Sequence, residues 1–303
     1  MRLVMMNNGL GNQAFQYIFM RYIEEHSGEP CIIDDLYFCD DKALHNGYEL
    51  EKIFSLKPRR LSQMLSEDVV QEILKLKQPA PGTAHPAHDI VSILRTSGIS
   101  LNVIQEADLY EHDYHVCLPD AKSYPINQFS PQILRNHGNL YYYGYWINAY
   151  WYEAIMDIIN YEFTFPLPQD LKNAQLLHEV LSSDRSVCIH IRRGDFIDCG
   201  WLLNEEFYRH SVASVKKVMK PVFYIFSDDM PYVKEHLSEY GLEASDEIIF
   251  VEGNTHGKNY IDMQLMAACR GMIIANSSFS YLAALLNRRA DRFVYNPTTR
   301  DIV

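Results

Sequence analysis

The chain has 303 residues, with 27 Lys and Arg against 39 Asp and Glu, so its formal net charge is −12. Hydrophobic residues make up 48% and charged residues 22%, as in soluble globular proteins, and the length allows two domains. Because nucleic acid or an anionic membrane surface calls for a basic face, neither is expected as the main partner.

The N-terminal residues predict a strand, a turn and a helix. The strand-like RLVMM is followed by the turn NNGLGN and by an amphipathic helical pattern that closes on Ser-Gly. Gly9, Gly11 and Asn12 lie in this turn, where glycines permit a tight bend and the helix start offers free N–H groups to an anion or a sugar. The spacing lacks the third glycine of a dinucleotide fingerprint, and a plain helix-opening turn accounts for it equally well.

The pattern weakens after a second strand, PCIIDD. Residues 78–89 form a loop rich in Pro, Gly and His, and residues 95–135 show no clean periodicity. Residues 139–159 are densely aromatic, and the two prolines of FTFPLPQD predict a crossing between domains. We place the domains at residues 1–165 and 166–303.

Strand-like and helix-like pieces alternate through the second domain. Apolar SVCIHI, PVFYIF, EIIFV, MIIA and RFVY are separated by stretches with helical spacing. This alternation predicts an α/β domain with a mostly parallel, doubly wound sheet. In such sheets ligands bind where strands end and helices begin.

A cluster of charged side chains follows the first of these strands. His190, Arg192, Arg193 and Asp195 lie within the six positions of HIRRGD. Two guanidinium groups at a strand end can grip a phosphate, with His190 as a further donor and Asp195 holding one guanidinium in place. The alternative is a structural Arg–Asp ion pair at a sheet edge.

Three further polar groups fall at strand ends or helix starts. FSDD places Asp228 and Asp229 after a strand, where acids often only cap the next helix. Asp262 opens an otherwise apolar helical stretch, either exposed at the helix start or accepting two N–H donors from a guanine. Strand MIIAN leads into a helix at Asn276, Ser277 and Ser278, which cap that helix or offer hydroxyl and N–H groups to a phosphate.

The sequence contains no targeting segment and no run of about 18 apolar residues, so no membrane span is expected. The scattered cysteines include no C-x-x-C pair. They indicate reduced thiols in the cytoplasm and no zinc site. They are Cys31, Cys39, Cys117, Cys188, Cys199 and Cys269.

These motifs resemble those of the alpha-1,2-fucosyltransferases of glycosyltransferase family eleven. GLGNQAFQY, GYW, HIRRGDF, FSDD and ANSSFSYLAALLN occur in that family's order over residues 9–287. The resemblance implies a GT-B fold, in which two Rossmann-like doubly wound domains face a cleft, with the acceptor on the N-terminal side and the GDP-sugar on the C-terminal side. It also implies GDP-fucose as donor substrate and inverting transfer to a glycan hydroxyl, usually O2 of galactose.

The same resemblance assigns roles to individual residues. Arg192 is the expected clamp on the β-phosphate, supported by His190, Arg193 and Asp195, and Asp262 is the expected reader of guanine. Other expected donor contacts are Asp228, Asp229, Asn276, Ser277, Ser278, Gly9, Gly11 and Asn12.

Departures from the family pattern concern the acceptor. Ile147 replaces the Gln that follows GYW, and Tyr281 and Leu282 replace two Trp after NSSFS. Animal members carry a membrane anchor that this sequence lacks, so we expect a bacterial enzyme of the cytoplasm, peripheral at the inner face of the membrane when it acts on lipid-linked glycans.

For the catalytic base, a carboxylate is required, and Asp195 is the first candidate, before Asp198, Glu205 and Glu206. No metal or further cofactor is expected, because the Asp pairs at 34–35, 40–41 and 228–229 are adjacent and no Asp-x-Asp loop is identified.

Two alternatives remain open at this stage. A catalytically inactive GDP-sugar-binding module would keep Arg192 and Asp262 but need no base. A nicotinamide-dependent oxidoreductase is disfavoured by the missing third glycine.

Overall fold

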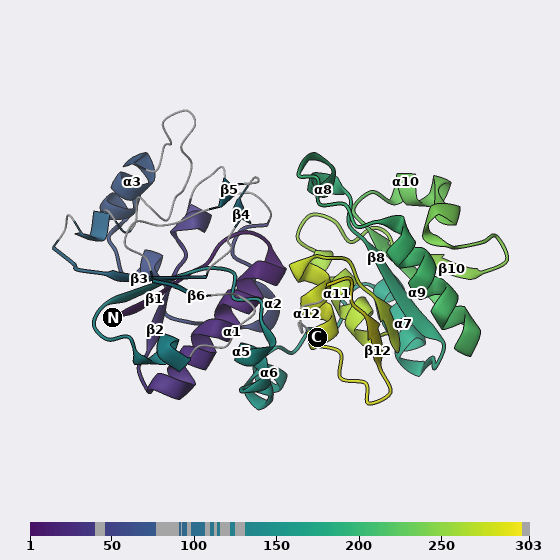
Figure 1. The fold of residues 1–303 in the computed structure, drawn as a ribbon, viewed down its shortest axis with the longest axis horizontal. Coiled ribbons are helices and arrows are strands. Elements are labelled where there is room, and N and C mark those ends of the chain that lie inside the picture. The colour runs from purple at the N-terminus through teal and green to yellow at the C-terminus, as the bar shows by residue number, and fades with distance from the viewer. Residues whose placement is uncertain are drawn as a thin grey trace. The chain divides into compact units, whose positions relative to one another are not determined.

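The computed structural model describes residues 1–39, 46–76, 91, 93–95, 98–106, 110–111, 114–115, 122–124 and 131–298 (Figure 1). The chain divides into two compact units, Met1–Glu162 (unit 1) and Phe163–Val303 (unit 2). The sequence predicts the division three residues later, after residue 165.

Unit 1 is built on a five-stranded parallel sheet in the order β2-β1-β7-β3-β6. Its strands are β1 (Arg2–Met5), β2 (Cys31–Asp34), β3 (Asn102–Glu106), β6 (Lys122–Tyr124) and β7 (Leu140–Tyr143), and a separate antiparallel pair is formed by β4 (Tyr110–Glu111) and β5 (Tyr114–His115). Its helices are α1 (Leu10–Ser27), α2 (Leu50–Phe54), α3 (Glu67–Leu76), α5 (Ala149–Glu153) and α6 (Met156–Glu162), with 3-10 turns at Leu36–Cys39, Leu61–Gln63 and Pro131–Arg135.

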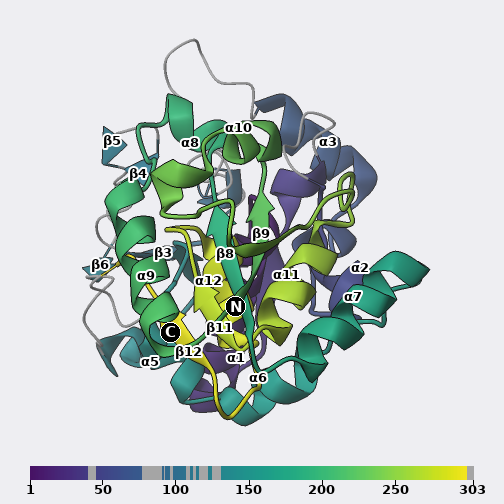
Figure 2. The same cartoon turned by 90° about the vertical axis from the view of Figure 1, so that its right-hand side faces the viewer.

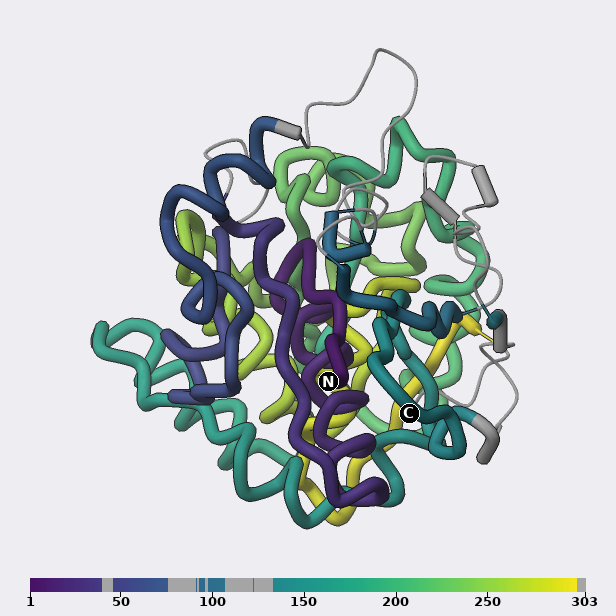
Figure 3. Tube along the Cα trace, turned by 90° about the vertical axis from the view of Figure 1, so that its left-hand side faces the viewer, coloured from purple at the N-terminus to yellow at the C-terminus, as the bar shows by residue number. Residues whose placement is uncertain are grey.

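The aromatic stretch predicted from the sequence forms part of the core of unit 1. Phe19 of α1 stacks on Trp146 with ring centroids 4.0 Å apart and meets Trp151 edge to face at 5.1 Å. Helix α1 ends where Gly28 turns left-handed at φ 68°, as the Ser-Gly pattern predicts. Figure 3 traces this purple N-terminal segment along unit 1.

Unit 2 contains a second five-stranded parallel sheet, in the order β10-β9-β8-β11-β12. Its strands are β8 (Ser186–Ile191), β9 (Val222–Ser227), β10 (Glu247–Phe250), β11 (Gly271–Ile273) and β12 (Phe293–Tyr295). Its helices are α7 (Leu171–Ser182), α8 (Gly194–Asp198), α9 (Glu205–Val218), α10 (Met230–Glu235), α11 (Asn259–Ala268) and α12 (Ser278–Leu285), with a 3-10 turn at Leu237–Tyr240.

Alternation along β8 sends side chains to two different layers. Val187, Ile189 and Ile191 are fully buried with apolar residues of α9. Cys188 and His190 point to the other face of the sheet, where His190 lies near Phe279 of α12. In Figure 2, α9 and α11 lie on opposite sides of this sheet.

The strand order reverses within each sheet. In unit 2 the chain runs from β8 outward through β9 and β10, then returns to place β11 on the other side of β8. In unit 1 the corresponding reversal lies between β1 and β7. A reversal opens a crevice at the carboxyl ends of the two central strands, and ligands of doubly wound sheets bind there.

Two local predictions for unit 2 need correction. MPYVKEHLSEYG, one of the stretches with helical spacing between the predicted strands, forms two short helices, because the helical run breaks at His236 before it ends at left-handed Gly241. The short helix α8, directly after β8, is not predicted by the sequence pattern, since five residues are too few to show helical periodicity.

None of the helices in the described ranges has the length and apolar character needed to span a bilayer. Cys31, Cys39, Cys188, Cys199 and Cys269 are free thiols, and Cys117 lies outside the described residues.

Candidate active site

Arg192 leaves the carboxyl end of β8 at the reversal point of unit 2. Its guanidinium is 2.6 Å from Asp195 Oδ1 and 2.9 Å from Asp228 Oδ2. The side chain stays 29% exposed. The ion pair that the sequence offered as an alternative to phosphate binding is therefore present, and it holds the guanidinium at the place where a ligand is expected.

Arg193 is committed to its neighbours more completely than Arg192. Its backbone N–H donates to Asp228 Oδ1 at 2.8 Å, and its Nε donates to Asp229 Oδ2 at 3.1 Å. Its guanidinium carbon lies 3.3 Å from the ring centroid of Tyr232. Asp229 also caps α10, as expected for the FSDD motif, and both acids anchor the arginine pair.

Gly194 lets Asp228 approach this cluster. A Cβ at position 194 would lie 2.4 Å from Asp228 Oδ2, closer than any real contact. The Gly of the HIRRGD motif therefore leaves room for the Asp228 carboxylate against the start of α8.

His190 is buried and uncharged. Burial lowers its pKa to about 3, with a further contribution from Arg192. Its Nδ1 has no hydrogen-bond partner among the described residues, and its ring centroid is 5.8 Å from that of Phe279 in the first turn of α12. A neutral imidazole can offer a hydrogen bond to an anion but adds no positive charge.

Residues 276–278 form the loop and cap at the start of α12. Ser277 accepts from the Phe279 backbone N–H at 3.3 Å and so fulfils the capping reading of this motif. Asn276 donates to the carbonyl of Trp201 at 3.0 Å, while its buried Oδ1 has no partner in the described part of the chain. Ser278 is the first residue of α12 and remains partly exposed.

Asp262 lies in the first turn of α11 and is largely buried. Burial raises its pKa to about 7, and the hydrogen bond from Asn254 Nδ2 to Oδ1, 2.7 Å long, opposes that rise. Asn254 is itself joined to Asn173 by a 2.8 Å hydrogen bond, and Asn173 to the α7 cap residue Asp170. Sequence reasoning missed this polar chain, because Asn173 and Asn254 are 81 residues apart.

The backbone of the NNGLGN turn in unit 1 differs from the prediction. The left-handed residue of NNGLGN is Asn8, at φ 61°, and not a glycine. Gly9 is in ordinary extended conformation at φ −79°. Gly11 is buried and Asn12 partly exposed, both within α1. Asn8 tolerates this conformation and donates to the Tyr145 hydroxyl at 3.1 Å.

Glu49 precedes α2 in the chain, and its side chain lies at the start of α1, where free N–H groups were expected. Its carboxylate is buried, which raises its pKa, and hydrogen bonds from Asn46 and from the Leu10 backbone N–H counteract that rise. Its own backbone N–H donates to Gln13 at 2.9 Å. With a carboxylate already at this helix start, the loop favours a neutral sugar hydroxyl over an anion.

Glu106, which sequence reasoning also missed, fixes the GYW turn. Its carboxylate accepts from the backbone N–H groups of Tyr145 at 2.8 Å and Trp146 at 3.1 Å. A Cβ on Gly144 would lie 2.7 Å from Glu106 Cβ. Trp146 is left-handed at φ 58°, so the buried acid maintains a strained turn at the carboxyl edge of the unit 1 sheet.

Three of the four candidate bases, Asp195, Asp198 and Glu206, are more exposed than Arg192 and Arg193, and Glu205 is partly buried. Asp195 is 54% exposed although it pairs with Arg192. Asp198 ends α8 and is exposed. Glu205 and Glu206 are in the first turn of α9, where acidic side chains also stabilise the helix dipole.

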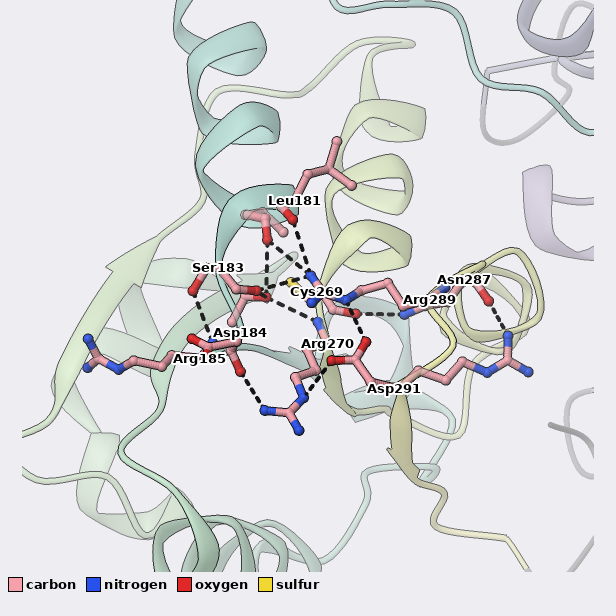
Figure 4. Close-up of polar contacts among 12 residues, drawn as sticks. Leu181, Ser183, Asp184, Arg185, Cys269, Arg270, Asn287, Arg289 and Asp291 are labelled. Carbon is pink, nitrogen blue, oxygen red and sulfur yellow. Dashed lines mark hydrogen bonds and ion pairs between the residues drawn. The ribbon is translucent and has the colours of Figure 1, made fainter.

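The amino edge of the unit 2 sheet carries arginines of another kind (Figure 4). Arg289 Nη1 donates to the Ser183 carbonyl at 3.0 Å, and Arg270 Nη1 to the Asp184 carbonyl at 2.8 Å. Asp291 pairs with both guanidinium groups. These arginines close the end of α7 and the loop before β8, so they are structural.

In the described residues, the adjacent Asp pairs form hydrogen bonds or ion pairs with other side chains. Asp34 accepts from the Tyr141 hydroxyl at 2.8 Å, and Asp35 pairs with Arg60 at 2.7 Å. The pair at 40–41 lies outside the described residues. Across the described ranges, no group of three or more His, Cys, Asp or Glu side chains is arranged to hold a metal ion.

Comparison with solved structures identifies the fold. NodZ alpha-1,6-fucosyltransferase soaked with GDP-fucose aligns with a TM-score of 0.53 at 13% identity, covering 94% of this chain and 91% of that one. Fucosyltransferase NodZ from Bradyrhizobium aligns with a TM-score of 0.51 at 12% identity, covering 94% and 92%. The predicted fold is confirmed: two Rossmann-like units with parallel sheets, of the GT-B type.

Sequence comparison identifies the family. Alpha-1,2-colitosyltransferase of Escherichia coli is 28% identical over 286 residues, 92% of this chain and 84% of that protein. The O-antigen biosynthesis glycosyltransferase WbnK of Escherichia coli is 25% identical over 319 residues, 96% and 92% of the two chains. The family model described as Glycosyl transferase family 11 matches residues 2–302. The chain therefore belongs to glycosyl transferase family 11.

Proposed function

We propose that this glycosyltransferase transfers L-fucose from GDP-fucose, with inversion, to a glycan hydroxyl, with O2 of a galactose as the preferred position. Unit 2 binds the nucleotide sugar and unit 1 the acceptor. The observation that carries the proposal is Arg192, held by Asp195 and Asp228 at the carboxyl end of a central strand, where the sheet order reverses.

The leaving group is stabilised by groups of unit 2. The acceptor oxygen forms a bond to the anomeric carbon while the bond from that carbon to the β-phosphate oxygen breaks, and GDP departs with the electron pair. Arg192 and the N–H groups at the start of α12 face the growing negative charge, and His190 adds a neutral donor. Such preorganised donors are usually the largest catalytic contribution.

Asp195 receives the acceptor proton in this proposal. Its carboxylate pairs with Arg192 at 2.6 Å. A diphosphate competes for the same guanidinium, and Asp195 then becomes available as a base. Asp195→Asn separates this role from mere positioning of Arg192: loss of a base lowers kcat without weakening GDP binding, whereas loss of positioning weakens GDP binding.

Guanine is read by Asp262, whose carboxylate can accept from both N1–H and the exocyclic amine. Asn276, Ser277 and Ser278 are further donor contacts at the start of α12. Asp228, Asp229 and Arg193 hold Arg192 in place and border the nucleotide. Gly9 and Asn12 contact sugar hydroxyls at the start of α1, where buried Gly11 also lies.

The reaction uses no metal ion in this proposal, because the cationic groups at the end of β8 occupy the position that a cation would take beside the diphosphate. One relative is named an O-antigen biosynthesis glycosyltransferase. We therefore place the acceptor among surface-polysaccharide repeat units, which brings the enzyme to the inner face of the membrane when the acceptor is lipid-linked.

The test is a donor screen followed by linkage analysis. Purified protein is incubated with GDP-fucose or GDP-colitose and a set of β-galactosides, since one relative is named a colitosyltransferase. The expected product carries fucose at O2 of galactose, identified by NMR. GDP binding without transfer from either donor would identify an inactive binding module, and transfer from GDP-colitose alone would change the donor.

A further inference from the structure

Three large apolar side chains are exposed just beyond the arginine cluster. Ile197 is 48% exposed, Trp201 39% and Leu202 41%, all on α8 or the loop that follows it. Figure 2 places α8 at the same end of the sheet as α10, which is the carboxyl edge. Trp201 is the largest of the three.

The position of Trp201 is fixed by the backbone. Gly200 ends α8 in left-handed conformation at φ 69° and donates to the Ile197 carbonyl at 3.3 Å. The Trp201 N–H donates to the Phe196 carbonyl at 3.0 Å, which completes a Schellman motif. The Trp201 carbonyl accepts from Asn276 at 3.0 Å, so both the backbone N–H and the backbone carbonyl of Trp201 are held.

Phe196 connects Trp201 to the phosphate clamp. The two rings meet edge to face, with centroids 5.7 Å apart at an angle of 88°. The guanidinium of Arg192 lies 5.5 Å from the centroid of the same Phe196 ring. Trp201 is therefore one aromatic ring away from Arg192, and hydrogen-bonded through its carbonyl to the loop that opens α12.

We propose that Trp201 is the platform for the sugar of the donor, and that the apolar rim formed with Ile197 and Leu202 selects a 6-deoxyhexose. The inference rests on the proposed function, in which Arg192 holds the β-phosphate. The donor sugar is bonded directly to that phosphate, so it lies about one ring away from Arg192, as Trp201 does. The C–H face of a pyranose packs on an indole ring, and the C6 methyl group of fucose adds apolar area that a hydroxymethyl group does not.

A purely structural role for Trp201 makes a different prediction. The hydrophobic contact between Phe196 and Trp201 is a regular companion of the Schellman motif. If it is the whole reason for the tryptophan, truncation lowers the melting temperature and affects all ligands alike. A platform instead acts only on ligands that carry the sugar.

Calorimetry with GDP, GDP-fucose and GDP-L-galactose distinguishes these roles, since the two sugars differ only at C6. Wild type is compared with Trp201→Ala, Trp201→Phe and the control Leu181→Ala, which removes an exposed apolar side chain at the amino edge. We expect Trp201→Ala to weaken GDP-fucose binding roughly tenfold, GDP-L-galactose binding less and GDP binding within twofold, with Trp201→Phe intermediate and the control unchanged.

Each other result contradicts the platform. Equal losses for GDP and GDP-fucose would make Trp201 structural, and an effect confined to the KM of the acceptor would assign the ring to the acceptor. A wild type that binds GDP-fucose no better than GDP would remove the sugar contact while nucleotide binding stands. Failure of the wild type to bind GDP would instead refute the proposed function itself.

Discussion

Replacing Asp262 by Asn perturbs one buried carboxylate and its partner Asn254 without changing volume. The pKa of Asp262 is 3.8 when solvent-exposed and about 7 in the folded chain. Below pH 3.8 both the folded and the unfolded states hold the proton. Between these two values only the folded state does, so the free energy of unfolding falls as pH rises, and the loss is complete above the folded pKa.

The size of this effect follows from the shift of about three pKa units, which corresponds to at most about 4 kcal/mol. The Asn variant carries no such charge. We expect its free energy of unfolding, relative to wild type, to increase from pH 4 to pH 7 and to level off near pH 8. Urea unfolding, followed by tryptophan fluorescence at pH 5, 6, 7 and 8, measures the difference. A difference independent of pH would show that Asp262 is ionised throughout and that burial does not control its charge.

Nucleotide binding depends on the same proton in the opposite direction. If guanine donates to an ionised Asp262, as proposed above, GDP affinity should be full above pH 7 and fall by up to tenfold per unit below it. Asn254 already donates to Oδ1, and an Asn at 262 would keep its oxygen there and turn its NH₂ group toward the guanine N–H groups. The expected loss is about 1.5–3 kcal/mol for GDP and far less for ADP. Equal losses for both nucleotides, or no proton release on binding GDP in calorimetry, would refute guanine recognition by this residue.

Other expected outcomes concern the clamp, the metal and the GYW turn. Arg192→Ala should lower kcat about a hundredfold to a thousandfold with an unchanged melting temperature, and activity within threefold of wild type would contradict its role. Exhaustive EDTA treatment should leave the transfer rate within twofold; a tenfold loss restored by Mg²⁺ or Mn²⁺ would point to Asp228 and Asp229 as ligands. Gly144→Ala should destabilise unit 1 by about 1–3 kcal/mol in thermal or urea unfolding, because its Cβ would press on Glu106, and full stability would show that this turn relaxes freely.

The structural features that carry the candidate site are strand ends and helix starts, and the local sequence encodes both. A run such as SVCIHI followed by RRGD identifies a strand and the point where it ends, because apolar β-branched residues and Gly-Asp have opposite local preferences. The sequence therefore predicts the parallel sheet of unit 2, the caps at Asp229 and Ser277, and the rim on which Arg192 lies.

Tertiary structure decides which groups meet on that rim. Asp228 reaches Arg192 across 36 positions of sequence, and Asn254 is joined to Asn173 across 81. Glu49 takes up the helix start that the glycines of unit 1 were expected to leave free, and Glu106 holds the GYW turn. In the sequence, these Asp, Glu and Asn residues cannot be distinguished from ordinary polar residues of the surface. The reason is physical, because a hydrogen bond or ion pair depends on the distance between two groups in space. Residue order fixes that distance only within one helix turn or one strand. The strand order that brings β8, β9 and β11 together is set by the packing of the whole unit.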